Sequence, residues 1–285
     1  MIGQRGLYIV LGALAGYALF GTYAAFGFAA VIVNLFTPLP AAFVGLRYGS
    51  AAGGITVALT LLIVLLTGGP TQGAMYLIQF GIPAAVLPWL LNRGMAWDKA
   101  VVVVLSAMAA ASLGGLLIFS IAAGESPLAM IGGLIDKEIA QTSTVMQEMF
   151  AETDLPADQR KEVARAVENM AAFLQNAYPG IVVTVAGLMT LGLVLLLALL
   201  ARGRYALPGK SFPQWKAPEQ LVWVLILSGF IVAFADGPLA TVALNMLVIL
   251  LPVYFLQGLA VIDCFFRRKA FSPVIRTIGY LLLTL

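Results

Sequence analysis

The sequence predicts an all-α fold: a polytopic bundle of transmembrane helices with an external amphipathic helical hairpin. Three observations predict it. Of the 285 residues 61% are apolar and only 10% are charged, the mean hydropathy is +1.00, and 13 of the 29 charged side chains fall within residues 124–178. Soluble domains do not have this composition. It excludes a soluble enzyme and a nucleic-acid-binding domain, and a single cysteine excludes an internal disulfide.

Apolar runs that could cross about 30 Å of hydrocarbon, each near 20 residues long, divide the chain. We identify nine such runs: residues 7–23, 25–46, 51–67, 73–91, 100–123, 181–201, 221–235, 239–266 and 271–285. They predict a membrane bundle of about five crossings in residues 1–123, the external segment 124–178, and three or four further crossings in residues 179–285.

Charge predicts the orientation of these runs. If each of the first two runs crosses once, twelve basic and three acidic side chains fall on one side, and four basic and ten acidic side chains fall on the other. The positive-inside rule then places the N-terminus in the cytoplasm and residues 124–178 outside. A single long first helix would place Arg47 outside, so we expect two crossings. The expected location is the bacterial inner membrane.

The external segment carries apolar residues at helical spacing in two stretches. The first holds Leu134, Ile135, Ile139, Thr142, Met146, Met149 and Phe150, and the second holds Val163, Val167, Met170, Leu174 and Tyr178. Leu155-Pro156 separates them, and proline suits a first helical turn. The pattern predicts a helical hairpin that is either a connector packed on itself or a docking surface for a membrane or envelope protein.

Catalytic chemistry has few candidates in this sequence. There is no histidine, which excludes a histidine base and a histidine metal site. Cys264 stands beside Asp263 and is expected to be a structural thiol. No predicted crossing has a charged residue at its centre, which argues against an autonomous ion-coupled pump. We therefore expect no cofactor and no metal, and an intramembrane enzyme is the least favoured function.

Uncharged polar residues do occur at membrane depth. Gln72, Tyr76, Gln79 and Pro83 share one helical face by their spacing, as do Asn245 and Asp263 on a later run. Asn34 precedes Thr37-Pro38-Leu39-Pro40, where two prolines are expected to break the helix and free carbonyl groups. Two interpretations remain open: these side chains join helices by hydrogen bonds, or some of them line a cavity for a neutral polar small molecule. The cavity candidates are Asn34, Gln72, Tyr76, Gln79 and Asn245.

Small residues suit close contact between membrane helices. The helix-packing candidates are Gly12, Gly16, Gly49 and Gly53.

Asp263 lies one helical turn before Arg267, so an i,i+4 ion pair is expected. Arg268 and Lys269 follow at the end of the same run, where the helix dipole and anionic lipids favour positive charge. We expect Asp263 to be partly buried and paired. This cluster is interpreted as a cytoplasmic anchor or, alternatively, as a contact with a partner.

Several stretches resemble the YybS-like family of uncharacterised bacterial membrane proteins. The most distinctive is Tyr254-Phe-Leu-Gln-Gly-Leu-Ala-Val-Ile-Asp-Cys-Phe-Phe-Arg-Arg-Lys269, and residues 38–54 and 69–93 are similar to the same family. Members usually carry a further polar, aspartate-containing tail. The resemblance therefore fits truncation after Leu285, and the alternative is that the natural chain ends there. The resemblance implies no activity.

The first six runs are also similar in topology to the six-helix substrate-binding subunits of energy-coupling-factor transporters. Their small-residue helix, which contacts a transmembrane partner, resembles Gly12-Ala-Leu-Ala-Gly16.

The favoured function is a membrane component that binds or transports a small molecule without its own ATPase. The alternative is an assembly protein that docks a partner through the external hairpin. The expected contacts are the lipid bilayer, a membrane or envelope protein and a neutral polar small molecule, but no nucleic acid.

Overall fold

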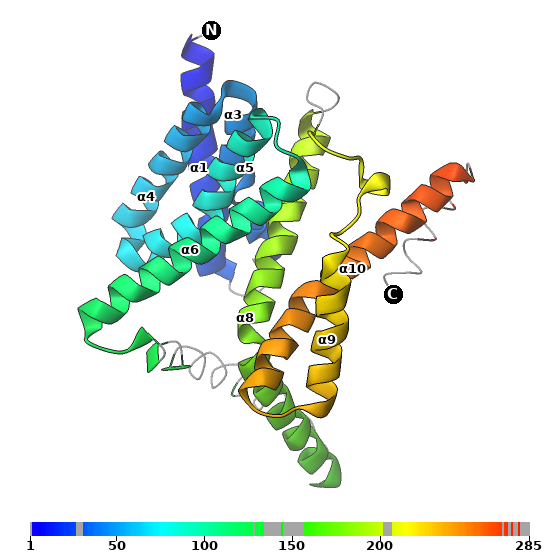
Figure 1. The fold of residues 1–285 in the computed structure, drawn as a ribbon. Helices are drawn as coiled ribbons and strands as arrows, with labels where there is room; N and C mark the ends of the chain where they lie inside the picture. The colour runs from blue at the N-terminus through cyan, green and yellow to red at the C-terminus, as the bar shows by residue number, and fades with distance from the viewer. Residues whose placement is uncertain are drawn as a thin grey trace. The chain divides into compact units, whose positions relative to one another are not determined.

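The computed structural model describes residues 2–26, 31–127, 129–130, 132–133, 144, 157–201, 207–269, 271–272, 275 and 279. Within these residues all regular secondary structure is helical (Figure 1), as the sequence predicts. The chain groups into two compact units, each built from two segments. The first unit comprises Met1–Phe119 and Val185–Gly209, and the second comprises Ser120–Thr184 and Lys210–Leu285.

Helices of the first unit follow the predicted apolar runs, with differences in where they break. The elements are α1 (Ile2–Phe26), α2 (Val31–Asn34), α3 (Leu39–Tyr48), α4 (Ser50–Tyr76), the π-helical η2 (Leu77–Gly81), α5 (Ile82–Asn92), most of α6 (Trp97–Ala123) and the C-terminal part of α8 (Ala157–Ala201).

Five helical stretches of the described residues are long and apolar enough to cross a membrane, by length and composition. They are Gln4–Thr22, Ser50–Asn92, Trp97–Ala123, Arg165–Leu200 and Pro238–Arg268, and Gln220–Phe234 is a shorter apolar helix. The described residues therefore do not form nine separate crossing helices. The ninth predicted run lies almost wholly outside them.

The second predicted run, residues 25–46, is not one helix. α2 ends at Asn34, a turn follows, and α3 begins at Leu39 with prolines in and before its first turn. Proline fixes φ and removes a donor, so it begins a helix more easily than it continues one. α3 has ten residues and is about 15 Å long, roughly half the hydrocarbon thickness. α3 alone is too short to cross.

The third and fourth predicted runs form one stretch that bends sharply at Gly69. Gly69 has φ 77° and ψ −176° inside α4 and is followed by Pro70, a backbone conformation that glycine tolerates and other residues do not. The two arms lie against each other, because a Cβ at Gly81 would stand 3.2 Å from Cγ1 of Val57. Gly69 therefore separates two packed helices where the sequence predicts two runs.

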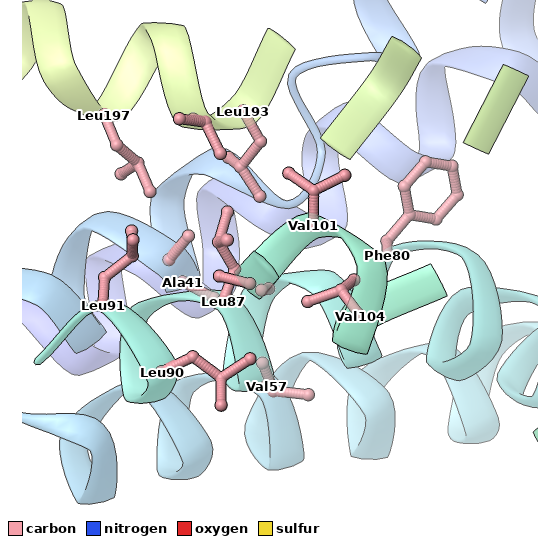
Figure 2. Close-up of a cluster of buried hydrophobic side chains, with 14 of the residues drawn as sticks. Ala41, Val57, Phe80, Leu87, Leu90, Leu91, Val101, Val104, Leu193 and Leu197 are labelled. Atoms are coloured by element: carbon pink, nitrogen blue, oxygen red, sulfur yellow. The ribbon is translucent and has the colours of Figure 1, made fainter. Parts of the chain in front are cut away.

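An apolar cluster forms the core of the first unit (Figure 2). Leu87 and Leu91 of α5, Val104 of α6 and Leu197 of α8 are almost completely buried in it. Lipid tails are as apolar as leucine, so in a bilayer such a core is stabilised by close packing more than by exclusion of water. The cluster holds α3, α4, α5, α6 and the end of α8 together.

The second unit contains the N-terminal part of α8, the short 3₁₀ helix η3 (Phe212–Gln214), α9 (Gln220–Phe234) and α10 (Pro238–Arg268). α9 and α10 pack against each other and are joined at Gly237, which has φ 75°. After η3, the backbone N–H of Ala217 donates to Oε1 of Gln257, at 3.2 Å. This hydrogen bond ties the segment before α9 to the middle of α10.

The predicted external hairpin is described only in its second half. The first predicted helix, residues 134–150, lies outside the described residues apart from Thr144. The second belongs to α8, which passes through Pro179 and continues to Ala201, so the predicted amphipathic helix and the sixth run are one helix of 45 residues. The division into residues 1–123, 124–178 and 179–285 stays a prediction.

Candidate polar sites in the membrane helices

Glycines of α1 bring it close to α4. A Cβ at Gly12 would stand 3.1 Å from Cγ2 of Thr56, and one at Gly16 would stand 3.4 Å from Oγ1 of Thr60. The Thr60 hydroxyl donates to the carbonyl oxygen of Thr56 at 3.0 Å and also lies 3.3 Å from that of Ala13. The glycine face of α1 is therefore occupied by α4 within this chain.

A second glycine contact joins α3 to α4. A Cβ at Gly53 would stand 2.7 Å from Cα of Gly45, so neither helix can carry a side chain at this crossing without moving. Gly49 differs from the other three predicted packing glycines, because it has φ 96° between the two helices and has nothing within 4 Å of its Cβ position. Its role is to turn the chain.

Tyr76 lies in an aromatic contact inside the first unit. It is 1% exposed, and its ring centroid is 5.6 Å from that of Phe20, in an edge-to-face arrangement. Phe80 contacts Phe20 in the same way at 6.0 Å. The Tyr76 hydroxyl shares a hydrogen bond with Thr60, so its polar atom has a partner.

The stretch from Gln72 to Pro83, in which the sequence places four side chains on one face, contains the π-helical turn η2. Its i→i−5 hydrogen bonding accommodates one extra residue, seen where Ile82 N–H bonds to the Leu77 carbonyl oxygen. Tyr76 and Pro83 are buried, whereas Gln72 and Gln79 are exposed. These four side chains therefore do not share one environment. Neither η2 nor the bend at Gly69 lies between Gln72 and Tyr76, so their common face stays a prediction. Whether any of these residues contacts a ligand stays a prediction.

Gln79 and Gln72 differ in their surroundings. Gln72 lies over the backbone of Gly68, whereas Gln79 makes no hydrogen bond to any other described residue. Met75 and Leu77, at 50% and 39% exposed, are the apolar surface residues near Gln79 in sequence. Gln79 is thus a carboxamide on an apolar helix surface.

The carboxamide oxygen of Asn34 is bonded locally. Its Oδ1 accepts a hydrogen bond from the hydroxyl of Thr37, at 2.6 Å, and Thr37 is 1% exposed. The bond spans the turn between α2 and α3. It stabilises the break that Pro38 and Pro40 introduce.

Asn245 of α10 forms a hydrogen-bonded clasp on α8. Its Oδ1 accepts from the N–H of Gly180 at 2.6 Å, and its Nδ2 donates to the carbonyl oxygens of Asn176 at 2.7 Å and Thr241 at 2.8 Å. Gly180 N–H and Asn176 C=O are the donor and acceptor of one i→i−4 pair in a regular α-helix. The carboxamide therefore bonds both groups beside Pro179, which has no N–H of its own.

Glycine at position 180 makes this clasp possible. A Cβ there would stand 2.9 Å from the backbone oxygen of Asn245. Nearby, the Thr184 hydroxyl donates to the Val248 carbonyl oxygen at 3.0 Å, a second bond between α8 and α10. Both Asn245 amide hydrogens have acceptors, which favours the helix-joining interpretation for this residue over the cavity interpretation.

The expected ion pair is present near the end of α10. Nε of Arg267 donates to Oδ1 and Oδ2 of Asp263, at 3.0 and 3.1 Å. The Asp263 side chain is 9% exposed and that of Arg267 is 61% exposed. Arg268 and Lys269 are exposed beyond it. Whether this cluster anchors the helix or contacts a partner stays a prediction.

Metal-binding and nucleophilic groups are sparse in the part of the chain that the structure describes. No group of three or more His, Cys, Asp or Glu side chains there could hold a metal ion, and Cys264 is exposed.

A comparison with known families identifies the class. Residues 15–285 match the family described as "Predicted membrane protein (DUF2232)". The chain belongs to this family. It is accordingly a DUF2232 membrane protein with several transmembrane helices. No curated protein and no solved structure matches it. Within DUF2232, the YybS-like and energy-coupling-factor resemblances remain predictions.

Three contact residues of this DUF2232 protein escaped the sequence analysis: Gly45, Thr60 and Gly180. Gly45 precedes Gly53 by eight residues, and Thr56 and Thr60 are four apart, so small residues at helical spacing could have indicated both. Pro179-Gly180, at the start of an apolar run, could have indicated a break that needs a polar partner.

Proposed function

We propose that this DUF2232 protein is a membrane component that binds a neutral polar small molecule, and serves transport without an ATPase of its own. The main support for this proposal is the exposed Gln79 carboxamide on the π-helical turn η2. A carboxamide left unbonded in hydrocarbon costs roughly 2 kcal/mol or more. A ligand that both donates and accepts hydrogen bonds would offset that cost.

Two further observations support Gln79 over Asn34 and Asn245. Asn34 and Asn245 are bonded within the chain, whereas Gln79 is not bonded to any described residue. π-Helical turns persist in proteins mostly as single turns, frequently at functional sites. The neighbouring Tyr76 and Phe80 are buried, which fixes the turn from its inner side.

The test compares wild-type protein, Gln79→Leu and Thr71→Val, purified in native-lipid nanodiscs. Small molecules are extracted from each sample and quantified by mass spectrometry. We expect one neutral polar compound to be enriched with wild type and to fall about tenfold with Gln79→Leu, since tenfold corresponds to about 1.4 kcal/mol. Thr71 is also exposed on this arm, so Thr71→Val controls for losing a polar surface group. Equal recovery from all three proteins would refute the proposal.

The assembly function is a second candidate, favoured by the N-terminal half of α8. Met170 and Phe173 are 51% and 48% exposed there, in the segment predicted to lie outside the membrane, where exposed apolar patches mark interaction sites. Photo-crosslinking in cells from positions 170 and 173 should capture the same envelope protein. A crosslinker at Ala172, which is exposed on another face, should not. Equal capture from all three positions would argue against a specific surface.

A further inference from the structure

Two arginines end neighbouring helices of the first unit. Arg47 lies in the last turn of α3, and Arg93 is the residue that caps α5. The helix ends are tied together, because Nδ2 of Asn92 donates to the Gly45 carbonyl oxygen at 3.2 Å. A Cβ at Gly45 would also stand 3.3 Å from the Pro88 side chain. Both guanidinium groups therefore belong to one end of the unit.

Aromatic rings hold both guanidinium groups. Cζ of Arg47 lies 5.4 Å from the ring centroid of Tyr8 and 5.3 Å from that of Tyr48, and these two rings are 5.2 Å apart. Cζ of Arg93 lies 4.1 Å from the ring centroid of Trp89. Cation–π contact of this kind orients a guanidinium without using its N–H donors, which remain in the guanidinium plane.

Neither charge is neutralised within the part of the chain that the structure describes. No carboxylate there lies within ion-pair distance of Arg47 or Arg93, and neither side chain has a hydrogen-bond acceptor among those residues. Both side chains are exposed. Each of these cations lacks a counter-charge among the described residues, so an anion bound beside adjacent helix ends would lower their energy.

The rings also indicate where this end lies. Tyrosine and tryptophan concentrate at the membrane–water interface, at the level of the lipid headgroups. Tyr8 and Tyr48 are half-buried, and Trp89 is 37% exposed. The arginine donors are thus expected at the level of the lipid phosphates, which accept paired N–H groups from arginine.

We propose that Tyr8, Arg47, Tyr48, Trp89 and Arg93 form a binding site for the headgroup phosphate of an anionic phospholipid. The two guanidinium groups donate to the phosphate oxygens, and the rings hold them in place. On the predicted orientation this is the cytoplasmic leaflet, whose anionic lipids attract positive charge. The site is separate from Gln79 and does not depend on the proposed function.

The experiment measures lipid binding by native mass spectrometry of the full chain in detergent, titrated with phosphatidylglycerol or phosphatidylcholine. We expect wild type to favour phosphatidylglycerol. The double variant Arg47→Gln/Arg93→Gln should lose about tenfold in affinity for phosphatidylglycerol, because charge-assisted hydrogen bonds are lost, with little change for phosphatidylcholine. Lys99→Gln removes an exposed charge of the same unit, and its affinity for phosphatidylglycerol should stay within about twofold of wild type.

A milder variant keeps the test informative if the double variant does not fold. Arg47→Lys retains the charge but lacks the planar fork, so its affinity for phosphatidylglycerol should fall several-fold. Millimolar inorganic phosphate should not displace the bound lipid. The proposal is overturned if phosphatidylcholine binds equally well, if Arg47→Lys and the double variant match Lys99→Gln, or if inorganic phosphate alone displaces the lipid, which would indicate a site for free anions.

Discussion

The two units hold their helices together in different ways. In the first, α1, α3 and α4 approach through glycines, with Cβ positions 2.7 to 3.4 Å from the facing helix at Gly12, Gly16 and Gly53. In the second, α8 and α10 are joined by side chains that bond backbone groups of the facing helix, from Asn245 and Thr184.

Both units use both devices, since Thr60 and Asn92 bond facing backbone oxygens in the first and Gly180 permits the approach in the second. Glycine contacts are more numerous in the first unit, and the bonds of Asn245 to α8 are the main link described between α8 and α10 in the second.

This difference predicts which substitutions each unit tolerates. Between glycine faces the contact is van der Waals packing, so added volume is costly and polarity matters little. At the clasp, the backbone groups beside Pro179 need a donor and an acceptor, so a residue of similar volume without them is costly. The first unit should therefore respond to size and the second to hydrogen-bonding capacity.

We expect the largest loss of stability in the first unit, from Gly53→Val. Its Cβ would stand 2.7 Å from the Gly45 backbone, and backbone cannot move aside as a flexible side chain can. We therefore expect the free energy of unfolding to fall by about 3 kcal/mol or more. Gly54→Val is the matched control, because nothing lies within 4 Å of its Cβ position, and its effect should stay within about 0.5 kcal/mol. Unfolding in detergent measures both. Equal losses would show that glycine packing does not distinguish these positions.

A smaller effect is expected at the clasp. Asn245→Leu removes three hydrogen bonds while the side chain keeps nearly the same size. We expect the free energy of unfolding to fall by roughly 1 to 3 kcal/mol. Asn245→Asp should cost more, because a carboxylate would face the carbonyl oxygens of Asn176 and Thr241. Met246→Leu, at an exposed neighbour, serves as the control. If Asn245→Leu is as stable as Met246→Leu, hydrogen bonding does not hold the second unit.

The smallest effect concerns the ion pair that ends α10. Asp263 is buried, but the Arg267 side chain is 61% exposed, so water screens the ion pair. We expect Asp263→Asn to lower the free energy of unfolding by about 1 kcal/mol or less. Arg267→Glu should also lower stability, and exchanging the two charges should restore part of the loss. Thermal unfolding of the single and double variants gives the coupling free energy. Strictly additive losses would remove the ion pair as a source of stability.

The sequence predicts local features of this molecule well. The all-α class and the Asp263–Arg267 pair follow from composition and from a spacing of four residues. The helix break at Pro38 and Pro40 follows from proline geometry. Each of these depends on neighbours in the chain, so periodicity and residue type are sufficient to predict them.

Features that depend on distant residues could not be predicted in the same way. Asn245 and Gly180 are 65 residues apart, and no spacing rule connects them. Regular helical geometry predicts one face for Gln72, Tyr76, Gln79 and Pro83, but η2 adds a residue between Tyr76 and Pro83 and so alters the register there. A π-helical turn has no reliable sequence pattern, which explains why the exposure of Gln79 was not foreseen.

The clasp has a consequence for how the protein is made. Asn245 leaves the ribosome 65 residues after Gly180, a delay of roughly 3 to 13 s at typical synthesis rates. During that interval the backbone groups beside Pro179 lack the carboxamide that bonds them in the finished protein. Until α10 docks, Gly180 N–H and Asn176 C=O can bond each other as an i→i−4 pair within α8, or bond water or the insertion machinery, because hydrocarbon supplies no partner. Biogenesis of α8 is therefore complete only after α10 has been synthesised and has docked.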